Sequence, residues 1–108
     1  MDDARRLGDI LACADEIARY MDGVDVAAFL ADAMRQRAIE RLLTIIGEAA
    51  KNIDQATRGA IDQPWREIIR LRDKGIHHYD SLAPASLHRI ATLSVPALAS
   101  AVRAHLHG

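Results

Sequence analysis

The sequence predicts an all-α domain, an antiparallel bundle of four or five helices. Half of the 108 residues are hydrophobic and only 4% are aromatic, and the apolar residues are mostly Ala, Leu and Ile, which suit closely packed helices. Apolar residues recur every three or four positions along most of the chain, whereas the alternation typical of a β-strand is absent. We therefore expect a single domain over residues 1–108 with one core.

The first half of the chain predicts two or three helices. The first is expected to run to about Met21, capped by Asp2 or Asp3 and ended by Gly23. After Asp25, which can cap the next helix, two apolar stripes follow each other out of phase, so we expect a bend near residues 34–37 or two successive helices. Gly47 lies inside the second stripe, where glycine is unfavourable, and this predicts close approach by a neighbouring helix.

The second half predicts two more helices after a turn over residues 57–63. Pro64 fits the first turn of a helix over about residues 65–79, because its missing N–H costs nothing there, and Gly75 would loosen that helix. A last helix follows Pro84. We expect a kink at Pro96, which removes one backbone hydrogen bond from that helix.

Composition excludes several classes of function. Cys13 is the single cysteine, which rules out an internal disulfide and a cysteine-based zinc site. We expect a cytoplasmic protein without membrane contact, because no leader pattern and no apolar run near the ~18 residues of a membrane span is evident.

The net charge of −1 hides an asymmetry: residues 1–33 carry three basic and eight acidic side chains, and residues 34–79 carry nine basic and six acidic ones. A local basic cleft is compatible with this balance.

Residues 65–80, WREIIRLRDKGIHHYD, depart from the pattern of an ordinary amphipathic helix. The apolar stripe of the first turns, continued by threes and fours, places Arg72 and Tyr79 where core residues belong. His77 and His78 sit beside them. Polar groups on an inward face are unfavourable unless they find partners, so this departure indicates a specific role.

Three interpretations of this cluster compete. In the first, Arg72 is a partly buried arginine paired with a carboxylate and the histidines are surface residues. In the second, a metal ion is bound, but adjacent His77 and His78 would project about 100° apart on a helix and do not readily share one ion. The third is phosphodiester chemistry, in which a histidine transfers protons and an arginine stabilises charge on phosphate oxygens.

Spacing constrains the third interpretation. Arg72 and His77 are five residues apart, so on a straight α-helix they point roughly 140° from each other. They converge on one phosphate only if the helix breaks near Gly75 or if a second subunit completes a shared cleft. Tyr79, seven residues after Arg72, does share its face.

These residues resemble a known family. Residues 72–79, RDKGIHHY, are similar to the Arg-x4-His-x-Tyr signature of HepT-like toxins in the HEPN superfamily. Residues 45–51, IIGEAAK, look like the IGEA block of that family, and residues 64–69, PWREII, look like the start of its motif helix. Because these blocks occur in order and at this chain length, the resemblance covers nearly the whole sequence.

The resemblance implies a HEPN fold, usually a homodimer, with metal-independent endoribonuclease activity on RNA and no cofactor. It also implies a type VII-like toxin–antitoxin system, in which an MntA-like nucleotidyltransferase antitoxin controls the toxin. The family motif assigns the RNase role to Arg72 and His77 and makes Tyr79 the site of AMPylation. Asp73 stands where the family often has Asn and would pair with Arg72, and Gly75 stands where a larger aliphatic residue is common.

Two other functions remain open from the sequence. One is a non-catalytic HEPN module that binds a nucleotide or a protein partner, which the weak basic balance and Asp73 favour. The other is a plain helical dimerisation domain with Arg72 in a buried ion pair.

Glu48 lies off the main stripe and is expected to be solvated or salt-bridged. The histidines distant from the motif are expected on the surface: His88, His105 and His107.

Overall fold

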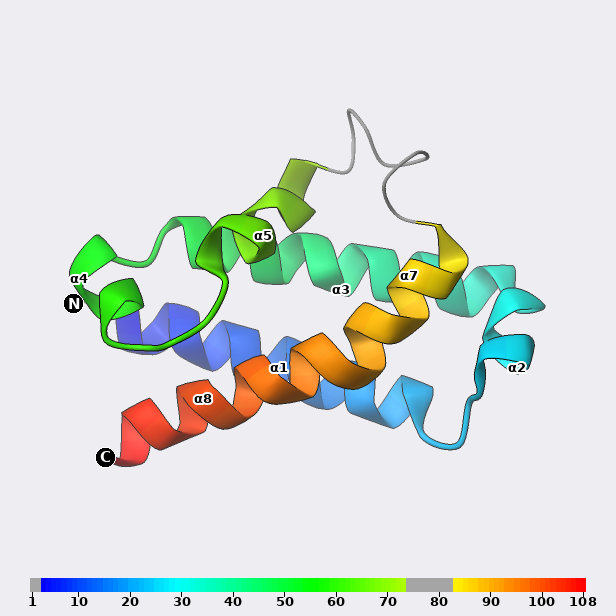
Figure 1. Ribbon diagram of the computed structural model, residues 1–108, viewed down its shortest axis with the longest axis horizontal. Coiled ribbons are helices and arrows are strands. Elements are labelled where there is room, and N and C mark those ends of the chain that lie inside the picture. Colours follow the sequence, from blue (N-terminus) through cyan, green and yellow to red (C-terminus); the bar gives the residue numbers. More distant parts are fainter. Residues whose placement is uncertain (1–2, 74–82) are drawn as a thin grey trace.

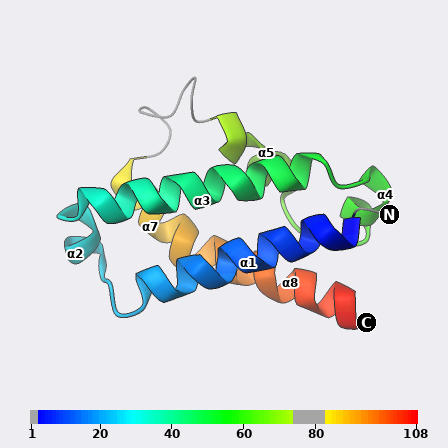
Figure 2. The same ribbon diagram turned by 180° about the vertical axis from the view of Figure 1, so that it is seen from behind.

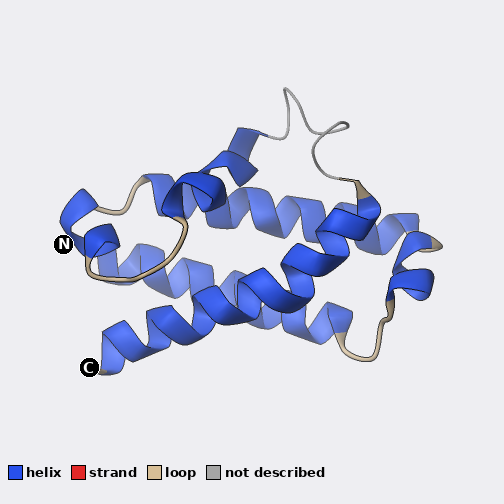
Figure 3. Ribbon diagram, in the orientation of Figure 1, coloured by secondary structure: helices blue, strands red, loops and turns tan. Residues whose placement is uncertain are grey.

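The structure, a computed structural model, describes residues 3–73 and 83–108 and confirms the all-α class (Figures 1 and 3). In chain order its elements are α1 (Asp3–Met21), α2 (Val26–Leu30), α3 (Ala33–Lys51), α4 (Gln55–Gly59), α5 (Trp65–Arg70), the 3-10 helix η1 (Leu71–Asp73), α7 (Pro84–Arg89), the π-helix η2 (Ile90–Ser94) and α8 (Val95–His107). These ranges contain no strand, and none of their helices is both long and apolar enough to cross a membrane.

The core lies between α1, α3 and the last helical segment. α3 runs antiparallel to α1, and α8 packs against α1 on the side away from the viewer in Figure 2. The expected apolar stripes supply this core. The largest side chains that are fully enclosed come from α1, α2, α3, α7 and α8: Leu7, Ile10, Ile17, Phe29, Ile39, Leu43, Ile46, Leu87 and Val102. Each such side chain contributes about 1.5–3 kcal/mol when it leaves water.

The phase change in the apolar stripes is a break between two helices. α2 ends at Leu30 and α3 begins at Ala33, slightly before the expected position. Asp25 caps α2, because its carboxylate accepts the Ala28 N–H at 2.8 Å, as the sequence predicted. Asp32 caps α3 through the Arg35 N–H at 3.0 Å, and this hydrogen bond lowers the pKa of the Asp32 carboxyl.

Asp3 has a different role from the expected helix cap. It is the first residue of α1, and its carboxylate reaches α4, which overlaps the start of the stretch expected to be a turn. Oδ1 of Asp3 accepts the Asp54 N–H at 3.1 Å, and Oδ2 accepts the Thr57 hydroxyl at 2.6 Å. A residue at the start of α1 therefore accepts hydrogen bonds from one backbone N–H and one hydroxyl at the start of α4.

The last helical segment bends as Pro96 predicted, although the change of winding comes before the proline. Residues Ile90–Ser94 form a π-helix, in which the Val95 N–H bonds to the Ile90 carbonyl. A wider π turn accommodates a proline ring that would otherwise clash with the carbonyl of the preceding turn. Figure 1 shows that α7 and α8 run in different directions on either side of this turn.

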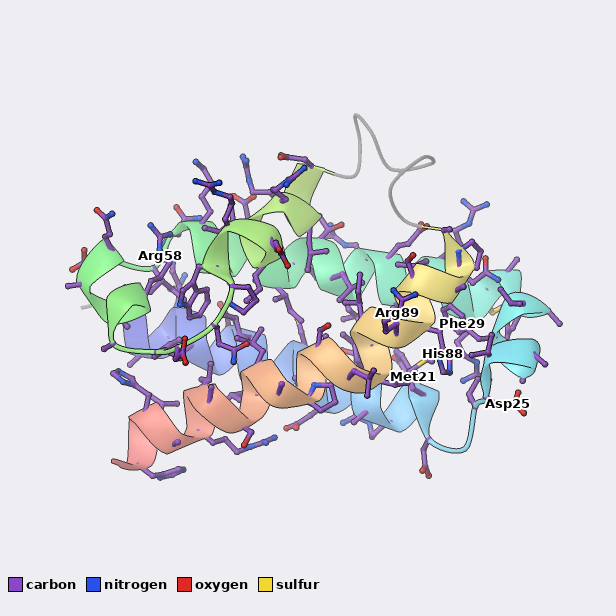
Figure 4. The ribbon with its side chains drawn as sticks, in the orientation of Figure 1. Met21, Asp25, Phe29, Arg58, His88 and Arg89 are labelled. Carbon is purple, nitrogen blue, oxygen red and sulfur yellow. The ribbon has the colours of Figure 1, made fainter. Side chains whose placement is uncertain are left out.

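His88 is half-buried, so the expectation of a surface position is wrong for this residue. Its Nε2 atom lies 3.0 Å from the Val24 carbonyl oxygen. Its ring packs edge-on against Phe29 with centroids 5.7 Å apart, and both side chains are labelled in Figure 4. His88 thereby ties α7 to the connection between α1 and α2, which periodicity within α7 cannot reveal. His105 and His107 are exposed, as expected.

Candidate active site at the contact of α3 and η1

Gly47 sets the distance between α3 and the segment that carries Arg72. A Cβ atom added at Gly47 would lie 2.6 Å from the backbone nitrogen of Arg72 and 3.0 Å from the carbonyl oxygen of Ile68. Both are backbone atoms that cannot rotate away as a flexible side chain can. The close approach predicted from this glycine is confirmed, and the approaching element is the α5–η1 segment.

The start of α5 is held by Trp65. Its indole Nε1–H donates to the carbonyl oxygens of Arg58 and Ile61, each at 2.9 Å. Arg58, labelled in Figure 4, in turn donates from Nη1 to the Ala50 carbonyl at 3.1 Å near the end of α3. This chain of hydrogen bonds ties α3, α4 and α5 together. One end of the α5–η1 segment is thus anchored by Trp65 and the other end by contact with Gly47.

The helix expected over residues 65–79 is shorter in the part of the chain that the structure describes. α5 ends at Arg70, after six residues, and tightens into the 3-10 helix Leu71–Asp73. In a 3-10 helix the side chains rotate further per residue than in an α-helix, so the direction of Arg72 differs from the one that α-helical spacing implies. The Arg72 side chain is partly exposed there.

Arg72 makes two ion pairs across its guanidinium. Nε lies 3.0 Å from Oε1 of Glu48 on α3, and Nη1 lies 3.3 Å from Oδ1 of Asp73. The planar guanidinium has its hydrogens in fixed directions, so these two contacts define its orientation. The pairing with Asp73 was expected. One-third of the Arg72 side chain remains exposed, so solvent or a ligand can still reach it.

Glu48 is the residue of this site that sequence reasoning missed. The sequence predicted a solvated or salt-bridged carboxylate, and the structure confirms the salt bridge, but the sequence did not identify Arg72 as its partner. The adjacent glycine was the available signal, because Gly47 marks the place where another segment touches α3. A polar residue next to such a contact is well placed to pair with that segment, as Glu48 does with Arg72.

The rest of the predicted motif, His77 and Tyr79, lies outside the described residues, as does Gly75. The structure therefore places Arg72 and Asp73 and brings Glu48 to them. Convergence of His77 with Arg72, by a break near Gly75 or by a second subunit, stays a prediction. The described elements on either side of the motif, η1 and α7, both contact α3.

Comparison with known proteins decides the family. Residues 10–105 of this chain match the sequence pattern of a family described as "Ribonuclease HepT-like". The chain belongs to this HepT-like ribonuclease family of the HEPN superfamily. A protein of Thermococcus cleftensis named "Probable ribonuclease HepT" is 37% identical over 93 residues, which cover 85% of this chain and 84% of that protein.

Other relatives of this HepT-like chain carry related names. A candidate RNase of Methanocaldococcus jannaschii is 40% identical over 74 residues, which cover 68% of this chain and 61% of the relative. A candidate RNase of Caldanaerobacter subterraneus is 38% identical over 74 residues, covering 68% of this chain and 66% of the relative. No match was found among solved structures.

The geometry around Arg72 is compatible with contact to a phosphate. An arginine held on one edge by a carboxylate can offer its remaining hydrogens to phosphate oxygens in a fixed direction. The two neighbouring carboxylates, Glu48 and Asp73, also oppose the binding of an anion at the same place. The guanidinium of Arg72 therefore has a fixed orientation toward a phosphate, while the two carboxylates weaken its electrostatic attraction for that phosphate.

Proposed function

We propose that this chain is a metal-independent endoribonuclease toxin that cleaves RNA through Arg72 and His77. The observation that carries the proposal is the oriented and partly exposed Arg72, in a chain that belongs to the HepT-like ribonuclease family. The substrate class follows from the family, and the residue roles follow from the motif in residues 72–79.

The proposed reaction is internal transfer within RNA. The 2′-hydroxyl oxygen attacks the neighbouring phosphorus and gives its proton to a base, while the bond from phosphorus to the 5′-oxygen breaks and that oxygen gains a proton from an acid. His77 serves in proton transfer, because an imidazole titrates near neutral pH. Arg72 stabilises the charge that develops on the phosphorane oxygens. A second copy of the chain supplies a second pair of these groups, so the active form is a homodimer.

The proposed control of the toxin acts on Tyr79. A nucleotidyltransferase antitoxin of the MntA-like type would transfer AMP from ATP to the Tyr79 hydroxyl oxygen, which forms an oxygen–phosphorus bond as pyrophosphate leaves. The adenylate adds bulk and a negative charge to the motif, seven residues after Arg72. Both effects oppose the binding of RNA phosphates.

The cleavage proposal is tested with purified wild type, Arg72→Ala and His77→Ala, each in excess chelator. Wild type should cut single-stranded RNA and leave a 2′,3′-cyclic phosphate, and each variant should lose at least about 100-fold in rate, the order of a proton-transfer or charge-stabilising contribution. Arg103→Ala, on the exposed face of α8, is the matched arginine control and should cleave normally. Equal cleavage by all four proteins would indicate a contaminant and overturn the assignment.

Control through Tyr79 is tested by intact mass. The chain is incubated with ATP and an MntA-like nucleotidyltransferase, and wild type should gain one or more AMP groups while losing RNase activity. Tyr79→Phe should gain none and should resist inactivation. An adduct of the same mass on Tyr79→Phe would place the modification elsewhere.

The pairing of Arg72 with both Glu48 and Asp73 favours one alternative, a non-catalytic HEPN module that partners a nucleotidyltransferase. In that case the arginine is neutralised within the protein and serves structure or docking. Tight association with the nucleotidyltransferase, without RNA cleavage and without growth arrest on expression of the chain alone, would support this alternative.

A further inference from the structure

A hollow of about 470 Å³ between α1 and α3 has a lining rich in arginine. Arg5 and Arg6 come from the first turns of α1, and Arg41 comes from α3. The two helices stand in front of the rest of the bundle in Figure 2, so neither α5 nor α8 covers the side they present there. The motif and the predicted chemistry make no use of these arginines.

Charge in the hollow favours an anionic ligand. Asp9 and Glu48 are its acidic lining residues, and Glu48 already shares its carboxylate with Arg72. Among residues 3–73 and 83–108, the ion pairs involve Arg35, Arg72 and Arg103 rather than the arginines of the hollow. Within these ranges no carboxylate pairs with their guanidinium groups, and planar guanidinium groups match phosphate oxygens in pairs.

Glu48 joins this hollow to the candidate active site. The residue lines the hollow, and its Oε1 atom accepts the Nε–H of Arg72 at 3.0 Å. Arg72 is therefore one side chain away from the lining of the hollow, within reach of an extended polyanion that occupies it. We propose that the hollow binds the phosphate backbone of the RNA strand beside the phosphate that is cleaved. This inference rests on the proposed function and adds Arg5, Arg6 and Arg41 as substrate-binding residues.

The lining supports a role in holding RNA without reading its sequence. Ile45 and Ala49 add apolar surface next to the arginines, which suits the sugar face of a strand. Guanidinium contacts with phosphates contribute affinity and register but carry no base specificity. We therefore expect these arginines to strengthen binding of every RNA sequence to a similar extent and to make binding depend on salt.

The test measures binding separately from cleavage. A fluorescent single-stranded RNA is titrated with the full chain carrying His77→Ala, over a range of salt concentrations. Adding Arg5→Gln or Arg41→Gln should raise the Kd several-fold at low salt and reduce the slope of log Kd against log salt by about 0.7 per arginine. The double variant should lose about twice that slope, because the two residues lie on different helices. Arg103→Gln, whose exposed side chain pairs with Asp15 away from the hollow, is the control and should change neither quantity.

Two outcomes would overturn the inference. One is a Kd and a salt slope in the hollow variants equal to those of Arg103→Gln. The other is weaker binding that accompanies a change in oligomeric mass, measured by light scattering. That result would assign the hollow to contact with the acidic residues 1–33 of a second copy. Circular dichroism confirms that each variant is folded. The proposed function fails separately from this inference, because it is tested by RNA cleavage with the wild-type chain, which retains His77.

Discussion

Nε of Arg72 lies 3.0 Å from Oε1 of Glu48, a residue 24 positions earlier in the chain. Both side chains are partly exposed, with 33% and 59% of their surfaces accessible. An ion pair in such a setting contributes only about 0–1 kcal/mol to stability. The contact matters more for direction, because it holds one edge of the guanidinium against α3 and leaves a defined edge for a ligand.

Replacement of Glu48 should impair cleavage more than folding. In Glu48→Ala the guanidinium of Arg72 loses its partner on α3, and misplacement of a charge-stabilising group by about 1 Å reduces rates by up to ~100-fold. We expect kcat to fall about 10- to 100-fold and the free energy of unfolding to change by less than about 1 kcal/mol. Glu48→Gln keeps an acceptor oxygen and should lie between wild type and Glu48→Ala.

Glu40→Ala is the matched control for Glu48, because Glu40 lies two turns earlier on α3 and is remote from Arg72. It should cleave RNA at the wild-type rate. An unchanged kcat in Glu48→Ala, or an equal loss in both variants, would refute the orienting role of Glu48.

Gly47→Ala and Gly8→Ala should have opposite effects on stability. The added methyl group at Gly47 would overlap the backbone of Arg72 and Ile68, so we expect a loss of about 1–3 kcal/mol and a lower rate of cleavage. At Gly8, inside α1, a Cβ atom would meet no atom within 4 Å. There alanine should stabilise the helix by about 0.5–1 kcal/mol.

Chemical denaturation of the two glycine variants, read together with cleavage rates, checks this prediction. Similar changes in both variants would show that the contact of α3 with the α5–η1 segment does not require glycine.

Asp73→Asn should strengthen RNA binding. The substitution removes a negative charge whose oxygen lies 3.3 Å from Nη1 of Arg72, while its side-chain oxygen still accepts a hydrogen bond. Since such an exposed pair is worth at most about 1 kcal/mol, we expect the Kd for RNA to fall by up to about 5-fold. Fluorescence titration in the His77→Ala background measures the change. Weaker binding would mean that Asp73 supports the active orientation of Arg72 instead of opposing the phosphate.

Asp3→Asn should lower stability in a pH-dependent manner. Hydrogen bonds from the Thr57 hydroxyl and then the Asp54 N–H lower the pKa of the Asp3 carboxyl. A carboxyl with a depressed pKa in the folded state stabilises it fully above its unfolded pKa, and this stabilisation is lost as pH falls through the folded pKa. The Tm difference between wild type and Asp3→Asn should therefore be constant above about pH 5 and shrink below about pH 4.

Thermal melts followed by circular dichroism from pH 3 to about pH 7 measure this difference. Thr57→Val removes the strongest donor to Asp3 and should reproduce part of the effect with the same pH dependence. A Tm difference that stays constant down to about pH 3 would contradict the linkage.

The sequence by itself determined the features that depend on near neighbours in the chain. The apolar stripe of α1, the cap at Asp25 and the break between α2 and α3 follow from residues within about four positions of each other, where helical geometry brings side chains together. Gly47 also predicted a close contact, because a glycine inside a helix is unfavourable without a packing reason. The blocks around residues 45–51 and 64–79 were enough to identify the family.

Only the tertiary structure decided which partners these residues meet. Glu48 reaches Arg72 across 24 positions, Asp3 reaches Thr57 across 54, and His88 reaches Val24 across 64. Such pairs depend on how whole helices pack, and helical periodicity carries no information about which exposed residues on two helices come within 3 Å. The 3-10 winding of η1 occurs at the segment that contacts Gly47, and it departs from the ideal α-helix on which the spacing argument for Arg72 was based.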